Sequence, residues 1–342
     1  MKKYYTRACN FYYGLNSKYL VKNKKAFPLK GNSEISFDHI EILSRNYKKK
    51  IHIKKIKKLP RNIKIKINKD LKKIIKKDKN FSNFKFNDNP NIMGILNLTP
   101  DSFSDGNKYN KKNISYNRAK YLVARSANII DIGGESTRPG SKKINIKKEW
   151  QRIKFTLRKL TKKTNLSLDT RKSEIMEKGI NLGVKLINDI SGLGHDKETI
   201  KILKRYGTPF VINHILGSPT NMQKNPKYND VLLDVYDYFE EKIKFVRDNG
   251  IKHNNIIIDP GIGFGKKLKH NMNLISNISI FHSLGFPILL GTSRKSFIKG
   301  ISGVNDDQRR LGGTVSSSLF AMMQGIQILR VHDVNDVMQA IK

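Results

Sequence analysis

The sequence contains a single cysteine, Cys9, among 342 residues, so an internal disulfide is excluded and a reducing compartment is indicated. It has no apolar stretch of the roughly 18–20 residues that span a membrane. The start, Met1-Lys2-Lys3, is not followed by an apolar run of signal-peptide length. We therefore expect a cytoplasmic protein without a membrane partner.

Acidic residues are scarce, with 28 Asp and Glu against 67 Lys and Arg, which gives a net charge of +39. Residues 1–90 hold 26 Lys and Arg against 6 Asp and Glu, so the excess is concentrated there. Lysine, isoleucine and asparagine are abundant throughout, which favours a compositional origin for the charge. Aromatic residues do not interleave with lysines as they do in single-strand binders. We therefore expect no nucleic-acid partner.

A basic nucleic-acid-binding protein is the alternative from a different functional class. It predicts binding to any DNA with a steep salt dependence, confined to residues 1–89.

Two regions can be distinguished along the chain. Residues 1–89 are predicted to form a basic N-terminal extension, a small α+β unit or a partly ordered arm. Within it, residues 51–53 and 63–67 alternate as half-buried strands do, and residues 68–79 suggest a short basic helix. The polar stretch 87–90 is a candidate linker. Residues 90–342 form the second region.

Eight short apolar runs recur in the second region and alternate with helical segments. The runs are residues 92–98, 128–132, 166–169, 186–190, 209–212, 256–259, 287–290 and 326–331. The clearest helical segments are residues 116–125, 149–160, 172–182, 197–206 and 230–247. Apolar runs of this length are typical of parallel strands buried on both faces. The pattern predicts an α/β fold, a (β/α)₈ TIM barrel, with an open doubly wound sheet as the alternative.

Polar residues end almost every apolar run, and in a parallel barrel these ends share one mouth. Asp131, Asp169, Asn188 and Asp259 end the second, third, fourth and sixth runs. Two carboxylates and an amide, from Asp169, Asn188 and Asp259, suit a flat heterocycle that presents several N–H donors. The spacing does not fit a helical zinc motif. For Asp189 and Asp333, a helix cap is a credible alternative.

The opposite side of the mouth is predicted to be cationic. Arg294 and Lys295 follow the seventh run, and Arg330 and His332 end the eighth. Phosphate sites in such barrels lie after strands seven and eight, so a diphosphate group would suit this wall. Asn97, at the end of the first run, could coordinate Mg²⁺ through its amide oxygen. Two turn-rich loops, residues 99–106 and 133–141, look suited to motion over a bound ligand.

Five motifs, in order along residues 90–342, resemble those of the dihydropteroate synthase family. They are ILNLTPDSFSDG (residues 95–106), GGESTRPG (133–140), DPGIGFGK (259–266), GTSRKS (291–296) and RVHD (330–333). The resemblance implies a transferase of folate biosynthesis. That enzyme condenses p-aminobenzoate with 6-hydroxymethyl-7,8-dihydropterin diphosphate to give 7,8-dihydropteroate and diphosphate. The N-terminal extension resembles that of some alphaproteobacterial members.

The resemblance also implies roles for individual residues and for partners. The implied catalytic residues are Asp101, Thr137, Arg138 and Lys295, and the implied pterin ligands are Asp131, Asp169, Asn188, Asp259 and Lys295. Asn97, Arg330 and His332 would hold the diphosphate, with Mg²⁺ on Asn97. Thr137, Arg138, Pro139, Phe264 and Ser296 would hold p-aminobenzoate. A homodimer and sulfonamide sensitivity are further expectations.

One stretch departs from the family pattern. After the fifth run the family carries Met-His-Met-x-Gly, whereas residues 213–217 read NHILG, with Asn213 in place of a methionine that packs on the pterin. The alternative enzyme is a methyltetrahydrofolate-binding barrel that passes a methyl group to a corrinoid. Such a barrel shares the Asp/Asn wall but needs no diphosphate site, and the residues 293–296 and 330–333 argue against it.

Overall fold

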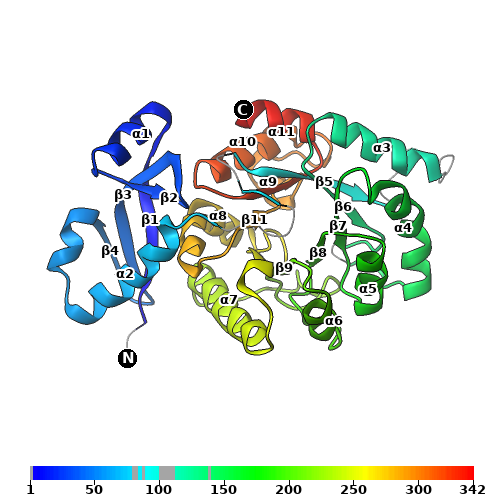
Figure 1. The fold of residues 1–342 in the computed structure, drawn as a ribbon, viewed down its shortest axis with the longest axis horizontal. Helices are drawn as coiled ribbons and strands as arrows, with labels where there is room; N and C mark the ends of the chain where they lie inside the picture. Colours follow the sequence, from blue (N-terminus) through cyan, green and yellow to red (C-terminus); the bar gives the residue numbers. More distant parts are fainter. Residues whose placement is uncertain (1–2, 79–83, 87–88, 100–111, 138–139) are drawn as a thin grey trace.

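The structure is a computed structural model. It describes residues 3–78, 84–86, 89–99, 112–137 and 140–342. A smaller N-terminal unit packs against the side of a larger barrel, and the two parts lie left and right in Figure 1.

Eight parallel strands form the larger part, in the order β10-β9-β8-β7-β6-β5-β12-β11. A parallel bridge between Ile258 of β10 and Ile288, the residue before β11, brings the two ends of the sheet together and closes the barrel. Each predicted apolar run overlaps one strand, so the predicted TIM barrel is confirmed. The strands are β5 (Asn91–Asn97), β6 (Ile129–Gly133), β7 (Asn165–Asp169), β8 (Leu186–Asp189), β9 (Phe210–Asn213), β10 (Ile256–Asp259), β11 (Leu289–Leu290) and β12 (Ile328–Val331).

Helices connect the strands and surround the barrel (Figure 1). The five predicted helical segments coincide with α3 to α7. The helices are α3 (Lys112–Ala124), α4 (Ile146–Leu160), α5 (Ser173–Asn181), α6 (Thr199–Tyr206), α7 (Val231–Asp248), α8 (Leu268–Ser276), α9 (Ser296–Ser302), α10 (Leu311–Met322) and α11 (Val334–Ile341). Two 3₁₀ helices, η3 (His253–Asn255) and η4 (Ile278–Leu284), complete this part.

The strands are apolar on both faces because each face meets a different core. One set of alternate residues, such as Ile130, Ile187 and Leu329, packs with the helices in the main core. The other set forms a dry layer inside the barrel, made of Met93, Ile129, Leu186, Val211, Ile257, Leu289 and Ile328. Phe84 and Phe86, which precede the first barrel strand, join this layer. The interior is therefore a packed floor rather than a channel.

The N-terminal unit is an antiparallel sheet with β3 pairing with β1, β2 and β4. Its elements are β1 (Tyr5–Tyr13), α1 (Gly14–Lys22), β2 (Phe27–Leu29), β3 (Asn32–Ser44), β4 (Tyr47–His52), η1 (Ile53–Lys58) and α2 (Arg61–Ile75). The strand predicted for residues 63–67 is wrong, because they lie within α2. Ile67, Leu71 and Ile74 recur at helical spacing and are buried, whereas Ile65 is 60% exposed.

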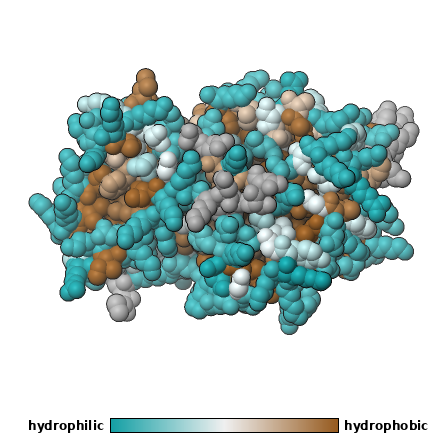
Figure 2. All heavy atoms as spheres, viewed as in Figure 1, coloured by the Kyte–Doolittle hydropathy of each residue, from teal (hydrophilic) through white to brown (hydrophobic). Residues whose placement is uncertain are grey.

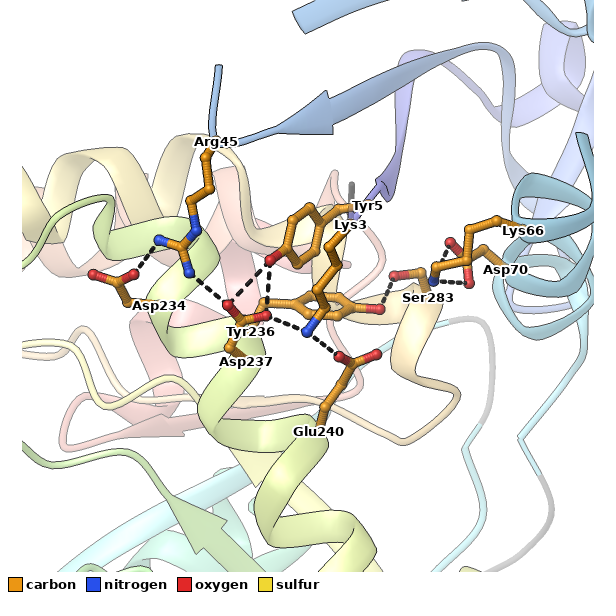
Figure 3. A network of polar contacts seen from close by, with 10 residues as sticks. All are labelled: Lys3, Tyr5, Arg45, Lys66, Asp70, Asp234, Tyr236, Asp237, Glu240 and Ser283. Carbon is orange, nitrogen blue, oxygen red and sulfur yellow. Dashed lines mark hydrogen bonds and ion pairs between the residues drawn. The ribbon is translucent and has the colours of Figure 1, made fainter. Parts of the chain in front are cut away.

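Polar contacts fix the N-terminal unit to α7 (Figure 3). The Tyr5 hydroxyl donates to Asp237 at 2.8 Å, and the Lys3 ammonium lies 2.6 Å from the same carboxylate. Arg45 pairs with both Asp234 and Asp237. On the neighbouring η4, the Ser279 hydroxyl donates to the carbonyl of Ala8 in β1 at 2.9 Å. The unit is therefore docked on the outside of the barrel, away from its polar mouth.

Hydrophilic side chains cover most of the face in Figure 2, and hydrophobic atoms come to the surface in separate patches on both parts. Within the described ranges, no helix combines the length and apolar character needed to cross a membrane.

Candidate active site

In five strands, a polar residue at the barrel mouth follows two positions after an apolar residue of the layer that fills the barrel. Alternate residues of a strand point to the same side. Ile129, Leu186, Val211, Ile257 and Ile328 form part of the floor. The same side of each strand then carries a polar residue two positions later: Asp131, Asn188, Asn213, Asp259 and Arg330. The change from apolar to polar side chains within each strand thus places the site directly above the floor.

Arg330 ties three strands together at the centre of this layer. Its Nε donates to Asp131 Oδ2 at 2.6 Å, and its Nη2 donates to Asp169 Oδ2 at 2.8 Å. The Asn188 amide nitrogen donates to the same Asp131 oxygen at 3.0 Å. The predicted separation into an acidic and a cationic wall is therefore wrong for Arg330. The Arg330 side chain is only 15% exposed, and its carboxylate partners offset its loss of hydration.

Two side chains of this cluster, Asp131 and Arg330, have polar atoms that are left to bind a ligand. Asp131 is completely buried, and its Oδ1 has no hydrogen-bond partner in the part of the chain that the structure describes. Burial raises the pKa of Asp169, and the Arg330 guanidinium opposes that rise. Arginine has five N–H donors, and the two ion pairs engage only Nε and Nη2. Further donors of Arg330 can therefore serve an anion.

Asp259 and Lys295 form the neighbouring part of the mouth. Asp259 Oδ1 accepts a 2.7 Å hydrogen bond from the backbone N–H of Gly261. The Lys295 ammonium lies 4.1 Å from the centre of the Phe264 ring, a cation–π contact. Burial and the Arg330 charge together lower the pKa of Lys295 to about 8, against the opposing effect of Asp259 and Asp169. Lys295 thus lies over an aromatic ring, where it also feels the charges of Asp259 and Arg330.

The loops after β11 and β12 hold each other through two pairs of side chains. Ser293 Oγ lies 3.0 Å from His332 Nδ1 and orients the imidazole. Arg294, expected in the cationic wall, instead donates from Nε to Asp333 Oδ2 at 3.0 Å. Arg294 is thus engaged by Asp333, and its place in the cationic wall stays a prediction. The Asp333 side chain makes no capping hydrogen bond to α11, so its alternative role as a helix cap is wrong.

Asn97 ends β5 in the same row as Gly133 of β6 and Asp169 of β7. A Cβ atom at Gly133 would lie 3.4 Å from Asn97 Oδ1 and 3.4 Å from the Asp169 Cβ. A side chain at position 133 would therefore stand between the two. Glycine here lets the amide of Asn97 and the carboxylate of Asp169 face one another.

Asn213, which departs from the family pattern, uses its amide within the protein. Its Nδ2 donates to the carbonyl of Ile190 at 3.0 Å, and the side chain is almost fully buried. The Tyr238 hydroxyl donates to the Asn213 carbonyl at 3.1 Å. Asn213 thus ties the end of β9 to the end of β8.

Lys266 is a buried residue whose role the sequence did not reveal, although it ends the DPGIGFGK motif. Its Nζ lies 2.8 Å from His214 Nδ1 and donates to the carbonyls of Gly261 at 2.9 Å and Phe264 at 3.0 Å. Burial lowers the pKa of Lys266 to about 7 and also lowers that of His214. Lys266 therefore clamps the loop after β10, which carries Phe264, to the loop after β9.

A buried ionic cluster supports the loop after β6 and was also missed. Glu135 Oε2 accepts from Arg171 Nε at 2.9 Å and lies 3.1 Å from the Lys172 ammonium. Lys172 also pairs with Glu149, which is completely buried. Glu135 Oε1 accepts from the backbone N–H of Ile144 at 2.9 Å. The cluster thus joins the loops after β6 and β7 to α4.

The remaining predicted residues differ in how far they can be placed. Thr137 follows Glu135 and is half-buried, and Ser296 is exposed at the start of α9. Asp101, Arg138 and Pro139 lie outside the described residues. Asp189, which the sequence left open as a cap, turns away from the mouth and accepts hydrogen bonds from the backbone N–H groups of Ser191 and Leu193.

Comparisons with known proteins agree with one another. The model of the pterin binding enzyme family matches residues 93–332. The dihydropteroate synthase of Escherichia coli is 38% identical over 255 residues, which cover 74% of this chain and 90% of that protein. The crystal structure of Yersinia pestis dihydropteroate synthase with a sulfonamide drug complex superposes with a TM-score of 0.73 at 36% identity, covering 77% of this chain and 96% of that one.

A second solved structure is that of a ligand complex. It is dihydropteroate synthase from Xanthomonas albilineans in complex with 7,8-dihydropteroate. It is similar to this chain with a TM-score of 0.68 at 32% identity, over 74% of this chain and 92% of that one.

Proposed function

Because this chain belongs to the dihydropteroate synthases of the pterin binding enzyme family, we propose that the side chains at its barrel mouth hold the two substrates of that reaction. The enzyme is a transferase that joins p-aminobenzoate to 6-hydroxymethyl-7,8-dihydropterin diphosphate and releases diphosphate. The proposed residue roles rest on the two hydrogen bonds that the Arg330 guanidinium donates to Asp131 and Asp169. Asn188 donates to Asp131 as well, so these side chains lie together above the apolar layer of the barrel.

The pterin ring would lie on Asp169, Asn188 and Asp259, with Asp131 below and Lys295 beside it. All three side chains are buried, so hydrogen bonds to the ring are made away from water. The carboxylates accept from the ring N–H groups, and the unpaired Asp131 Oδ1 supplies one further oxygen. The Lys295 ammonium donates to a ring acceptor.

The diphosphate would lie against the N–H groups of Arg330 that the two carboxylates leave available, with His332 and Asn97 at its sides. Positive charge here stabilises the negative charge that grows as the carbon–oxygen bond breaks. The leaving diphosphate takes the electron pair of that bond. The arylamine nitrogen then forms its bond to the pterin methylene carbon and gives up one proton. No protein nucleophile is needed for this sequence.

Magnesium fits this arrangement through Asn97. Mg²⁺ commonly binds one or two protein oxygens and completes its shell with substrate phosphates and water. The described residues contain no cluster of three or more His, Cys, Asp or Glu suited to a metal. The half-buried Asn97 amide at the mouth is therefore the ligand that we assign. A bound Mg²⁺ would offset the charge of the diphosphate.

p-Aminobenzoate would lie against Phe264 and Lys295, with its carboxylate at Ser296 and with Thr137, Arg138 and Pro139 over it. Phe264 offers an aromatic face, and Lys295 lies 4.1 Å from its centre. Of these residues, Arg138 and Pro139 lie outside the described part of the chain. Asp101 also lies outside it, and we propose a catalytic role for this residue.

The reaction itself gives the test of the function. We expect diphosphate and 7,8-dihydropteroate to appear together when the protein is mixed with the pterin diphosphate and p-aminobenzoate. Diphosphate release without product in the presence of p-aminobenzoate would contradict the assignment. The methyl-transferring alternative predicts neither product.

Glu135 is expected to position the loop that covers p-aminobenzoate. Glu135→Gln removes the charge that faces Arg171 and Lys172 while keeping an oxygen for the Ile144 N–H. We expect KM for p-aminobenzoate to rise about tenfold and the free energy of unfolding to fall by about 2 kcal/mol, because a buried ion pair is broken. Pterin affinity should change less than about twofold.

The matched control is Glu174→Gln in α5. Glu174 pairs with Lys178, but both side chains are largely exposed, so this substitution should change stability by less than about 0.5 kcal/mol. Steady-state kinetics and denaturant unfolding measure both effects. An unchanged KM for p-aminobenzoate in Glu135→Gln would show that the cluster has only a structural role.

We further propose that a second copy of the chain covers the outer face of α8, α9 and α10. Leu268 in α8, Ile301 in α9, and Leu311 and Phe320 in α10 are all more than one third exposed. The three helices are adjacent, since a Cβ at Gly300 of α9 would meet Leu268 of α8 and a Cβ at Gly313 of α10 would meet Ile298 of α9. An apolar face of this kind is typical of a homodimer interface.

We also propose a cytoplasmic location, because a single cysteine suits a reducing compartment.

Phe320→Glu tests the homodimer. We expect it to convert a dimer to a monomer in sedimentation velocity, because a charge would be buried at the interface. Tyr121→Glu in α3 is the control, since Tyr121 is 46% and Phe320 45% exposed. A dimer that survives Phe320→Glu, or one that Tyr121→Glu also disrupts, would contradict this interface.

A further inference from the structure

The N-terminal unit contains a hollow of about 550 Å³ at a distance from the barrel mouth. Its polar lining comes from β3, β4 and η1 and consists of His39, Lys49, Lys50, His52, Lys55 and Lys58. The volume lies within the range of about 300–1,000 Å³ that small-molecule sites occupy. Because every lining residue lies between positions 39 and 59, a ligand here would not touch the active site.

The four lysines of the hollow lack carboxylate partners. None of Lys49, Lys50, Lys55 and Lys58 forms an ion pair within the described ranges, whereas the adjacent Lys48 pairs with Glu41 at 3.4 Å. Like charges around one hollow repel each other, and this repulsion is relieved when an anion binds between them.

The nearest carboxylate, Asp38, is already occupied and cannot neutralise the lysines. One of its oxygens accepts from Asn10 Nδ2 at 2.7 Å and also pairs with His39 Nδ1. The other accepts from the Tyr12 hydroxyl at 2.8 Å. Burial alone would raise the pKa of Asp38, but the hydrogen bonds from Asn10, His39 and Tyr12 outweigh it and lower the pKa, so the carboxylate charge is balanced within this network.

The two imidazoles add hydrogen-bond donors to the hollow. His52 Nδ1 accepts from the backbone N–H of Lys54 at 3.1 Å, so the ring hydrogen of His52 is on Nε2. That nitrogen lies 3.9 Å from Asp38 Oδ2, too far for a hydrogen bond. The His39 ring packs edge-on against His52 with 5.0 Å between ring centres. The lining therefore presents ammonium and imidazole N–H groups to a ligand.

We propose that this hollow binds a small anion that carries two or more linked phosphates. Phosphate oxygens are acceptors only, and lysine ammonium groups bind them as point charges. Ile51 is buried and Leu59 partly buried, and both line the hollow, so its base is apolar enough to contact a flat ring attached to the phosphates. Among the residues that the structure describes, no Phe, Tyr or Trp lines the hollow, which disfavours the stacking platform that single-stranded nucleic acid requires.

The 3₁₀ helix η1 provides a matched pair of variants for the test. Lys55 and Lys58 line the hollow, whereas Lys54 and Lys57 are exposed on the same helix and do not. The double variants K55Q/K58Q and K54Q/K57Q therefore remove the same charge from the same helix. Only the first removes donors from the hollow.

The measurement is calorimetric titration of the full chain with inorganic triphosphate at physiological salt. Any binding at the barrel mouth is common to both variants, so their difference reports the hollow. We expect K55Q/K58Q to weaken the N-terminal binding at least about tenfold and K54Q/K57Q less than about threefold. Formation of 7,8-dihydropteroate should be unchanged in both, which separates this inference from the proposed function.

Two further ligands complete the test. ATP shows whether a ring attached to the phosphates adds affinity, and a single-stranded oligonucleotide tests nucleic acid as the alternative partner. Equal affinity for ATP and inorganic triphosphate would assign recognition to the phosphates, and tighter ATP binding would assign a role to the apolar base. Either result supports the proposal. It is overturned if triphosphate does not bind, if both double variants lose affinity equally, or if a single-stranded oligonucleotide binds more tightly than triphosphate.

Discussion

Replacing Asp169 with alanine is expected to lower the affinity for free pterin about a thousandfold without unfolding the barrel. Two hydrogen bonds to a buried carboxylate are worth about 2 kcal/mol each, and every 1.4 kcal/mol is tenfold in affinity. Asp169 also accepts from Arg330 Nη2, so its loss frees one arm of the fork. Isothermal titration with the pterin, together with a thermal unfolding curve, measures both parts of this expectation.

Asp189→Ala is the matched control for Asp169→Ala. Asp189 is also a buried aspartate at the end of a barrel strand, but its carboxylate faces the β8–α6 loop and accepts from Ser191 and Leu193. We expect this variant to lose stability, by about 1–3 kcal/mol, and to keep pterin affinity within about threefold. Unchanged pterin affinity in Asp169→Ala would contradict the assigned pterin site.

Arg330→Ala is expected to weaken the pterin diphosphate about a thousandfold and free pterin only about tenfold, because only the former meets the guanidinium directly. The smaller loss arises because Asp131 and Asp169 are left without their shared counter-charge. Arg330→Lys should restore little, since a single ammonium cannot bridge two carboxylates with the fixed geometry of Nε and Nη2. Calorimetry with both ligands gives the two affinities.

The same variant has a predictable effect on pH dependence. Burial raises the pKa of Asp169 and the Arg330 charge opposes that rise, so removing the charge raises the pKa further. If Asp169 acts as a carboxylate, the acidic limb of the rate profile should move to higher pH in Arg330→Ala. Equal losses for both ligands, or an acidic limb that stays in place, would argue against the role given to Arg330.

The sequence predicted the barrel because its strands are apolar on both faces. All eight runs, such as residues 256–259, became strands with nearly the predicted bounds. It also predicted that Asp131, Asp169, Asn188 and Asp259 gather at one mouth, because the carboxyl ends of parallel strands lie at the same end of a barrel. Both features depend on the order of residues within each strand, which a sequence records directly.

The pairings across strands could not be read in the same way. Arg330 was expected to face the acids from the other wall, yet it binds two of them. Arg294 was expected at the mouth but pairs with Asp333. Which carboxylate a long cationic side chain reaches depends on barrel curvature and on burial, neither of which appears in a linear pattern. The buried partners of Lys266 and Glu135 were missed for the same reason.

The N-terminal unit shows a different limit of sequence reasoning. Residues 63–67 alternate as a strand does, yet they lie in α2, whose buried positions continue through Leu71 and Ile74. In a Lys-Ile-rich stretch a period of two over five residues also fits part of a helical pattern. The longer window, with burial at Ile67, Leu71 and Ile74, is what distinguishes the two.

The assignment of the pterin ring and the diphosphate to one barrel mouth is tested most directly by a crystal structure of the protein with pterin diphosphate bound. We predict the ring on Asp169, Asn188 and Asp259, and the diphosphate within hydrogen-bond distance of Arg330, beside Asn97 and His332. Density for the ring or the diphosphate outside this mouth, with these side chains free of ligand, would contradict the account.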